Sequence, residues 1–129
     1  MTIKFKNLPA FNKELQLFGK QTTPEAERFF AGRLALDLLR RIVFRTPVDT
    51  GRARGNWQTV VGSSNESTVE GGGAPLAGGA AVIAGAPPFS VITIFNNVKY
   101  IRKLEEGSSR QAPTGMVRVS VAEVDAQFK

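Results

Sequence analysis

The acidic side chains are the groups of this chain that could do chemistry, because the sequence contains no histidine and no cysteine. Their absence excludes an imidazole base, a thiol nucleophile, a Ser–His–Asp triad and a zinc or iron–sulfur site built on thiolates. A pair of carboxylates could still carry out hydrolysis. Glu105 and Glu106, however, are neighbours on an expected helix and point to different faces. Glu25 and Glu27 lie in an expected first helical turn, where acids suit the helix dipole. We therefore predict no catalytic residue and no enzyme activity.

Metal and nucleotide sites lack the motifs that such sites need. The sequence has no Asp-x-Asp-x-Asp-Gly run of the kind that binds calcium. The glycines at 51, 55 and 71–73 are not followed by the Gly-Lys-Ser/Thr of a phosphate-binding loop. We predict no metal site and no bound cofactor.

Basic residues are concentrated in the first half of the chain. Residues 1–57 carry 11 Lys and Arg against 5 Asp and Glu, whereas residues 58–129 carry 6 of each, so the net charge of +6 belongs to the first half. Such an asymmetry indicates a polyanion or an acidic protein surface as partner. The simpler interpretations are a solubilising charge, or ion pairs with Asp37, Asp49 and acids of a neighbouring chain. Five arginines fall within fifteen residues: Arg40, Arg41, Arg45, Arg52 and Arg54.

A long amphipathic helix must position most of these arginines. Thr23 can cap its start, Pro24 suits its first position, and Pro47 follows its end near Arg45. One broad arc of this helix is apolar, and the opposite stripe is polar. Phe30 and Phe44 lie near the polar stripe, so we predict that they contact another segment or subunit. The apolar arc contains Phe29, Ala31, Ala35, Leu36, Leu38, Leu39, Ile42 and Val43; the polar stripe contains Arg33, Asp37, Arg40 and Arg41.

Shorter elements complete a small single domain of the α+β class, in which one long helix packs on an antiparallel sheet with additional short helices. We expect strands over 56–61 and 89–95 and a short helix over 98–106 that ends at Gly107. The segment 71–86 is either a loop or a weak helix, and 116–128 is a strand or, more in keeping with its length, a helix. Residues 1–22 are expected to form an arm or short helix, and residues 23–129 the domain. The expected turn is built by Pro47, Asp49, Thr50 and Gly51.

Three ordered motifs give the chain a family resemblance. They are RTPVDTGRARGNW at 45–57, NNVKYIRKLEEG at 96–107 and QAPTGMVR at 111–118. With these motifs the chain resembles, over about residues 11–125, the tail-component family of tailed double-stranded-DNA bacteriophages. Members of that family act in tail completion and head–tail joining.

The resemblance implies a structural virion protein that forms a ring, often of six copies, between the head connector and the tail tube. Its partners would be further copies of itself, neighbouring neck and tail-tube proteins and, without sequence specificity, genomic DNA in the channel. It would be located in the virion tail or neck, and in the host cytoplasm during assembly. A tail terminator and a head-side joining protein remain alternatives. No signal peptide is expected, because residues 1–7 alternate Lys with Ile and Phe and form no apolar run. No membrane-spanning helix is expected, because Pro87-Pro88 interrupts the long uncharged segment.

The alternative function is a non-specific nucleic-acid-binding protein that uses its basic N-terminal half.

Particular residues are expected to serve the virion role. Trp57 is expected to pack under the long helix. The residues expected at intersubunit or DNA-channel contacts are Arg40, Arg41, Arg45, Arg52, Arg54, Arg102, Glu105 and Glu106.

Overall fold

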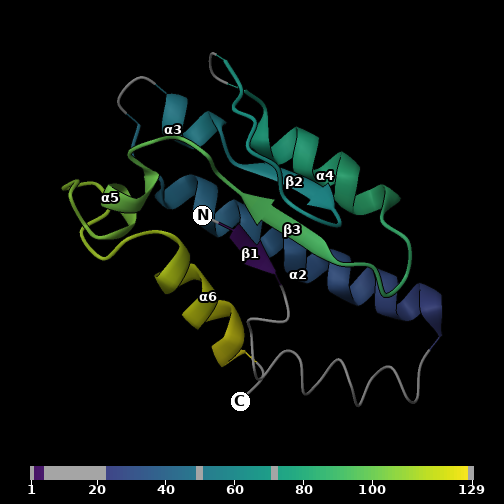
Figure 1. The fold of residues 1–129 in the computed structure, drawn as a ribbon. Coiled ribbons are helices and arrows are strands. Elements are labelled where there is room, and N and C mark those ends of the chain that lie inside the picture. Colours follow the sequence, from purple (N-terminus) through teal and green to yellow (C-terminus); the bar gives the residue numbers. More distant parts are fainter. Residues whose placement is uncertain (1, 5–22, 49–50, 71–72, 128–129) are drawn as a thin grey trace.

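The computed structural model describes residues 2–4, 23–48, 51–70 and 73–127. These residues form a small α+β domain with a long helix and a small antiparallel sheet, as the sequence predicted. Of the predicted N-terminal arm or short helix over 1–22, residues 2–4 form a strand, and the rest lies outside the described residues. The elements in chain order are β1 (Thr2–Lys4), α2 (Pro24–Arg45), α3 (Arg52–Gly55), β2 (Gln58–Val61), α4 (Pro75–Gly85), β3 (Ile92–Phe95), α5 (Ile101–Glu105) and α6 (Val117–Ala126) (Figure 1).

The sheet has the strand order β1-β3-β2, and both neighbours run antiparallel to β3. All four residues of β3 are buried, in keeping with its central position and its uniformly β-forming sequence. The strand is shorter than the predicted 89–95, because Phe89 has a φ of 61° and cannot continue an extended chain. Thr59 of β2 is paired with Ile94 of β3, so these two side chains share one face of the sheet.

The long helix begins and ends where the sequence predicted. The Thr23 hydroxyl accepts a hydrogen bond from the Ala26 N–H at 3.1 Å, and Pro24 occupies the first turn. In Figure 1, α4 lies along one side of α2 and α6 along the other, with the sheet in front. The buried side of α2 joins Trp57, Ile94, Met116 and Val124 in the main core; from the helix it includes Leu34, Leu38, Leu39, Ile42 and Val43.

The glycine- and alanine-rich segment is a helix, α4, and it packs against both α2 and β2. Gly79 is buried, and a Cβ at this position would collide with Leu39 and lie 3.0 Å from the Thr59 hydroxyl oxygen. The small residues therefore let α4 come close to its two neighbours. This close packing stabilises a helix that its own composition disfavours.

Two further elements differ from or extend the sequence-based expectation. The segment after residue 116 is a helix, α6, with Ser120 and Val124 buried, so the strand alternative is wrong. A single helical turn, α3, stands between the predicted turn and β2, and the strand begins at Gln58 rather than at residue 56. Within the described ranges, no helix combines the length and the apolar character that crossing a membrane requires.

Candidate interaction surfaces

The first motif closes the C-terminal end of α2. Thr46 is fully buried; its backbone N–H and its hydroxyl both donate to the Ile42 carbonyl, at 3.0 and 2.7 Å. The Trp57 indole N–H donates to the Thr46 hydroxyl oxygen at 2.8 Å, so the predicted packing of Trp57 under the helix is confirmed. Arg54 donates to the carbonyls of Thr46 and Phe44, both at 3.1 Å. These contacts satisfy carbonyl groups that a helix end otherwise leaves without partners.

Two buried asparagines fasten the chain around this end. Asn56 donates to the Val69 carbonyl at 2.9 Å and accepts from the Val69 N–H at 2.7 Å, as a neighbouring strand would. Asn96 donates to the Ala53 carbonyl at 2.9 Å and accepts from the Val98 N–H at 3.0 Å. The amides of the first and second motifs therefore replace backbone pairing at places where the sheet has ended.

The three motifs meet at one end of the molecule. The Gln111 side chain accepts from the Val48 N–H at 3.0 Å and so joins the third motif to the first. Beside this contact is an open groove of about 680 Å³, which we call the motif groove. It is lined by Pro47, Gly51, Arg52, Ala53, Tyr100, Leu104, Ser108, Ser109 and Gln111.

The predicted turn is described in part. Pro47 is buried, and Gly51 has a φ of 81° at the start of α3, which explains the need for glycine there. Asp49 and Thr50 lie outside the described residues, so their predicted part in the turn stays a prediction.

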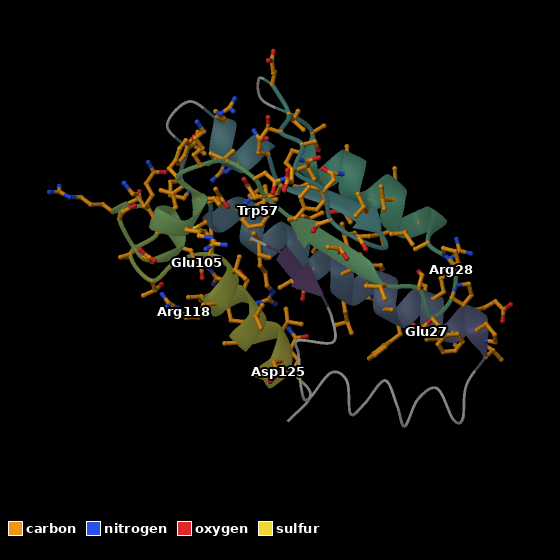
Figure 2. The ribbon with its side chains drawn as sticks, viewed as in Figure 1. Glu27, Arg28, Trp57, Glu105, Arg118 and Asp125 are labelled. Carbon is orange, nitrogen blue, oxygen red and sulfur yellow. The ribbon has the colours of Figure 1, made fainter. Side chains whose placement is uncertain are left out.

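Glu105 caps the start of α6. Its carboxylate accepts hydrogen bonds from three consecutive backbone N–H groups, those of Met116, Val117 and Arg118, at 2.8–2.9 Å. Figure 2 places Glu105 beside the first turn of α6, next to Arg118, which donates back to the Glu105 carbonyl at 3.3 Å. Glu105 was predicted as an intersubunit or channel contact; the structure gives this carboxylate an intramolecular role.

Two of the predicted contact arginines, Arg41 and Arg45, join α2 to α6 through Glu123. Arg45 donates with both terminal nitrogens to Glu123, one of them at 2.8 Å, and Arg41 lies 3.2 Å from the same carboxylate. Arg41 also pairs with Asp37 at 3.0 Å. The hydrogen bonds from Arg45, then those from Arg41, lower the pKa of Glu123 from 4.5 to about 2. The positive charges of Arg41 and Arg45 are thus balanced by the carboxylates of Asp37 and Glu123.

A buried acid, Glu27, holds the start of α2 to the loop before β3. Glu27 is 3% exposed, and its carboxylate accepts from the Phe89 N–H at 2.8 Å. The sequence suggested only a dipole role for Glu27. The contact spans 62 residues, so nothing in the local pattern could have found it.

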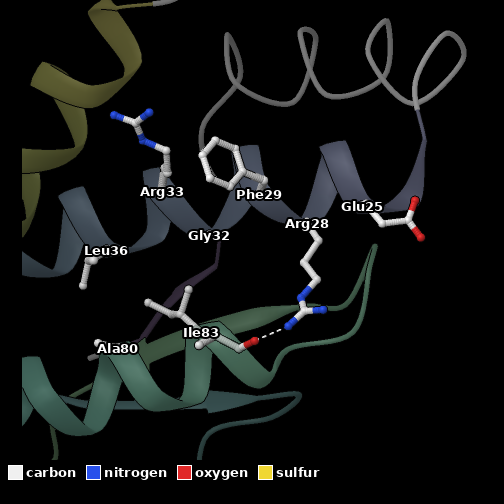
Figure 3. A pocket seen from close by; sticks show the side chains of 9 residues that line it. Glu25, Arg28, Phe29, Gly32, Arg33, Leu36, Ala80 and Ile83 are labelled. Carbon is white, nitrogen blue, oxygen red and sulfur yellow. Dashed lines mark hydrogen bonds between the residues drawn. The ribbon is translucent and has the colours of Figure 1, made fainter.

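An exposed face of α2 brings together two aromatic and two basic side chains. We define the α2 face as Phe29, Arg33, Arg40 and Phe44, which fall within about 60° of one another at roughly 100° per residue. Phe29 is 67% and Phe44 61% exposed, and the Arg33 guanidinium lies 5.7 Å from the centre of the Phe29 ring. Figure 3 shows Phe29 and Arg33 on the side of α2 that faces away from α4.

The α2 face revises the sequence-based choice of aromatics. Phe44 is exposed, as its position near the polar stripe suggested. Phe30 instead packs partly against the main core. Phe29, which the helical wheel placed in the apolar arc, is 67% exposed. At roughly 100° per residue it lies within about 40° of Arg33 and Arg40, at the edge of the polar stripe.

The remaining predicted contact residues lie at the surface. Arg40 is exposed and forms no ion pair with any described residue. Arg52, Arg102 and Glu106 are exposed at the end that holds α3 and α5 (Figure 1). No group of three or more acidic side chains in the described part of the chain is arranged to hold a metal ion.

Comparisons of the chain with protein-family models, with curated proteins and with solved structures found no match. The family resemblance therefore rests on the three motifs alone.

Proposed function

We propose that this chain is a structural virion protein of a tailed bacteriophage. In this proposal it forms a ring at the neck or tail end and joins the head connector to the tail tube. The observation that carries the proposal is the α2 face, because it has the composition and shape of a contact between subunits.

The α2 face presents large apolar side chains to solvent. Phe29 and Phe44 are both more than 60% exposed and are fifteen residues apart, which is about 22 Å along a helix. Arg33 and Arg40 lie between them. Aromatic residues and arginine are the types enriched in protein–protein interfaces, where they supply most of the binding free energy.

Two open grooves adjoin the α2 face, and Phe29 and Arg33 line both of them. One groove, of about 430 Å³, runs between α2 and α4 and is lined by Gly32, Leu36, Ala80 and Ile83 (Figure 3). Another, of about 550 Å³, extends from Arg33 and Arg40 towards Gln127 at the end of α6. The ring itself comes from the family resemblance, since a contact that uses two different surfaces of each copy closes by rotation into a ring.

The resemblance supplies the second line of support. Several residues of the first two motifs hold the fold through buried or capping hydrogen bonds. They are Thr46, Asn56, Trp57, Asn96 and Glu105. The motifs therefore describe this fold rather than a reaction centre. Motif residues that serve the fold fit a protein whose task is assembly.

Negative-stain microscopy and sedimentation equilibrium of the purified chain test the proposal. We expect rings for the wild type and monomers for the double variant Phe29→Ser/Phe44→Ser, because the ridge of the α2 face is lost. The control is Phe89→Ser/Val91→Ser, which removes exposed apolar side chains from outside α2 and should leave rings intact. A wild type that stays monomeric, or rings that survive loss of the α2 face, would overturn this function.

A further inference from the structure

Four basic side chains gather around α5, at the end of the molecule opposite the start of α2 (Figure 1). They are Lys99, Arg102, Lys103 and Arg110, and all four are exposed. We call this set the α5 surface. The motif groove, lined by Tyr100 and Leu104 from the same segment, opens beside it.

Folding engages one of the two carboxylates that the sequence places in residues 99–110. Glu105 directs its carboxylate to the three N–H groups at the start of α6, where the helix dipole and the hydrogen bonds stabilise it. Glu106 is the acid that remains exposed among the described residues 99–110. The segment therefore exposes four cations and one carboxylate.

The fold has the opposite effect on α2. Arg41 of the polar stripe pairs with Asp37 and Glu123, and Arg45 at the end of α2 pairs with Glu123. Glu123 comes from the half of the chain that has no net charge. The tertiary structure thus places a carboxylate of α6 beside the arginines of α2. The cations of the α5 surface outnumber the acids of the same segment.

The composition of the α5 surface indicates a phosphate backbone rather than a protein. Lysine is depleted in protein–protein interfaces, which need buried apolar anchors. Tyr100, at 39%, is the only large apolar side chain of residues 99–110 that is substantially exposed, whereas Phe29, Phe44 and Phe89 lie elsewhere. Single-stranded nucleic acid is held by stacking on several aromatic rings. One tyrosine is too few, so the charge pattern fits a duplex.

We infer that the α5 surface binds the phosphate backbone of double-stranded DNA without sequence specificity. Lys99, Arg102, Lys103 and Arg110 make the contacts, and the α2 face does not. This inference goes beyond the proposed function and does not depend on ring formation, because each copy carries the complete set of cations.

Fluorescence anisotropy with the full chain and a labelled random-sequence DNA duplex tests the inference over a range of KCl concentrations. The test variant is Arg102→Gln/Lys103→Gln, and the matched control is Arg28→Glu, which lowers the net charge by the same amount at an exposed site outside the α5 surface and the α2 face. We expect the test variant to bind at least about tenfold more weakly at low salt. The slope of log K against log salt should become shallower by about 0.9 for each lost contact. The control should keep the wild-type affinity and slope.

Several results would overturn the inference. These are an absence of wild-type binding at low salt, equal losses in both variants, or poly-glutamate that competes as well as unlabelled duplex at equal charge. The last result would assign the α5 surface to an acidic protein. Circular dichroism establishes that both variants are folded. Sedimentation of the same variants reads ring formation separately, so a failure of DNA binding and a failure of assembly are distinguished.

Discussion

At the scale of single residues, the two adjacent glutamates of the second motif have different environments. Glu105 accepts three backbone hydrogen bonds at the start of α6, whereas Glu106 is exposed. A carboxylate that receives N–H groups at a helix start gains from both the hydrogen bonds and the helix dipole. Glu105 is therefore a structural residue, and Glu106 is the one that a partner can reach.

The pair provides a direct test of the cap. Glu105→Gln keeps one acceptor oxygen but removes the charge, so we expect it to lower the free energy of unfolding by about 1 kcal/mol. Glu105→Ala should cost about 1–2 kcal/mol, because all three N–H groups lose their acceptor. The control Glu106→Gln should change stability by less than about 0.5 kcal/mol. Urea denaturation measures all three; equal effects of the Gln substitutions at 105 and 106 would contradict the cap.

The sequence predicted that Trp57 of the first motif is buried, but not which groups the residues of this motif hydrogen-bond. Trp57 was expected to pack under the long helix, and its place in the main core with residues of α2 confirms this. The hydrogen bond from Trp57 to Thr46 and the pairing of Asn56 with Val69 were not foreseen. These contacts depend on how the chain returns upon itself, and residue type alone does not show which buried amide meets which backbone group.

At the scale of elements, α4 shows how packing decides a structure that local preference leaves open. Its two central glycines disfavour a helix by about 1 kcal/mol each. Gly79 faces Leu39 and Thr59, whereas Gly78 has no atom within 4 Å of the place where its Cβ would be. The long helix α2, by contrast, has a capping threonine, a first-turn proline and a regular apolar arc. Local signals therefore fixed the ends of α2 but not the state of 71–86.

The glycine pair predicts opposite effects of the same substitution. Gly78→Ala should raise the free energy of unfolding by up to about 1 kcal/mol, because alanine favours the helix and meets no neighbour. Gly79→Ala should lower it by about 1–2 kcal/mol, since the buried Leu39 must leave its position and this outweighs the gain in helix preference. Thermal and urea denaturation of both variants measure the two effects. A Gly79→Ala protein as stable as Gly78→Ala would contradict the close approach of α4 to α2.

At the scale of the whole molecule, the distribution of charge follows the fold and not the order of the chain. The first half carries the excess of cations in sequence, but Glu123 of α6 lies against Arg41 and Arg45 of α2. No reading of residues 1–57 alone could supply that acid, because it is 78 residues away from Arg45. Part of the basic region predicted on α2 is thus a junction between α2 and α6. Arg40 and the α5 surface keep their charge at the surface.

The junction between α2 and α6 predicts how stability depends on pH. Arg45 and Arg41 lower the pKa of Glu123 from 4.5 to about 2 in the folded chain. A group whose pKa is lower in the folded than in the unfolded state stabilises the fold above its unfolded pKa. This stabilisation is therefore complete above about pH 4.5 and is lost as the pH falls towards about 2. Glu123→Gln should be less stable than the wild type at pH 7, and the difference should shrink to near zero at about pH 2.

Urea denaturation at several pH values between 7 and 2 measures this convergence, with Glu66→Gln as the control. Glu66 is exposed and makes no ion pair with the described residues, so its replacement should leave the wild-type curve almost unchanged. Added salt should reduce the gap between the wild type and Glu123→Gln at pH 7, because the junction is partly exposed to solvent. A gap that stays constant from pH 7 to pH 2 would show that Glu123 contributes through packing, and that its charge does not hold α6 to α2.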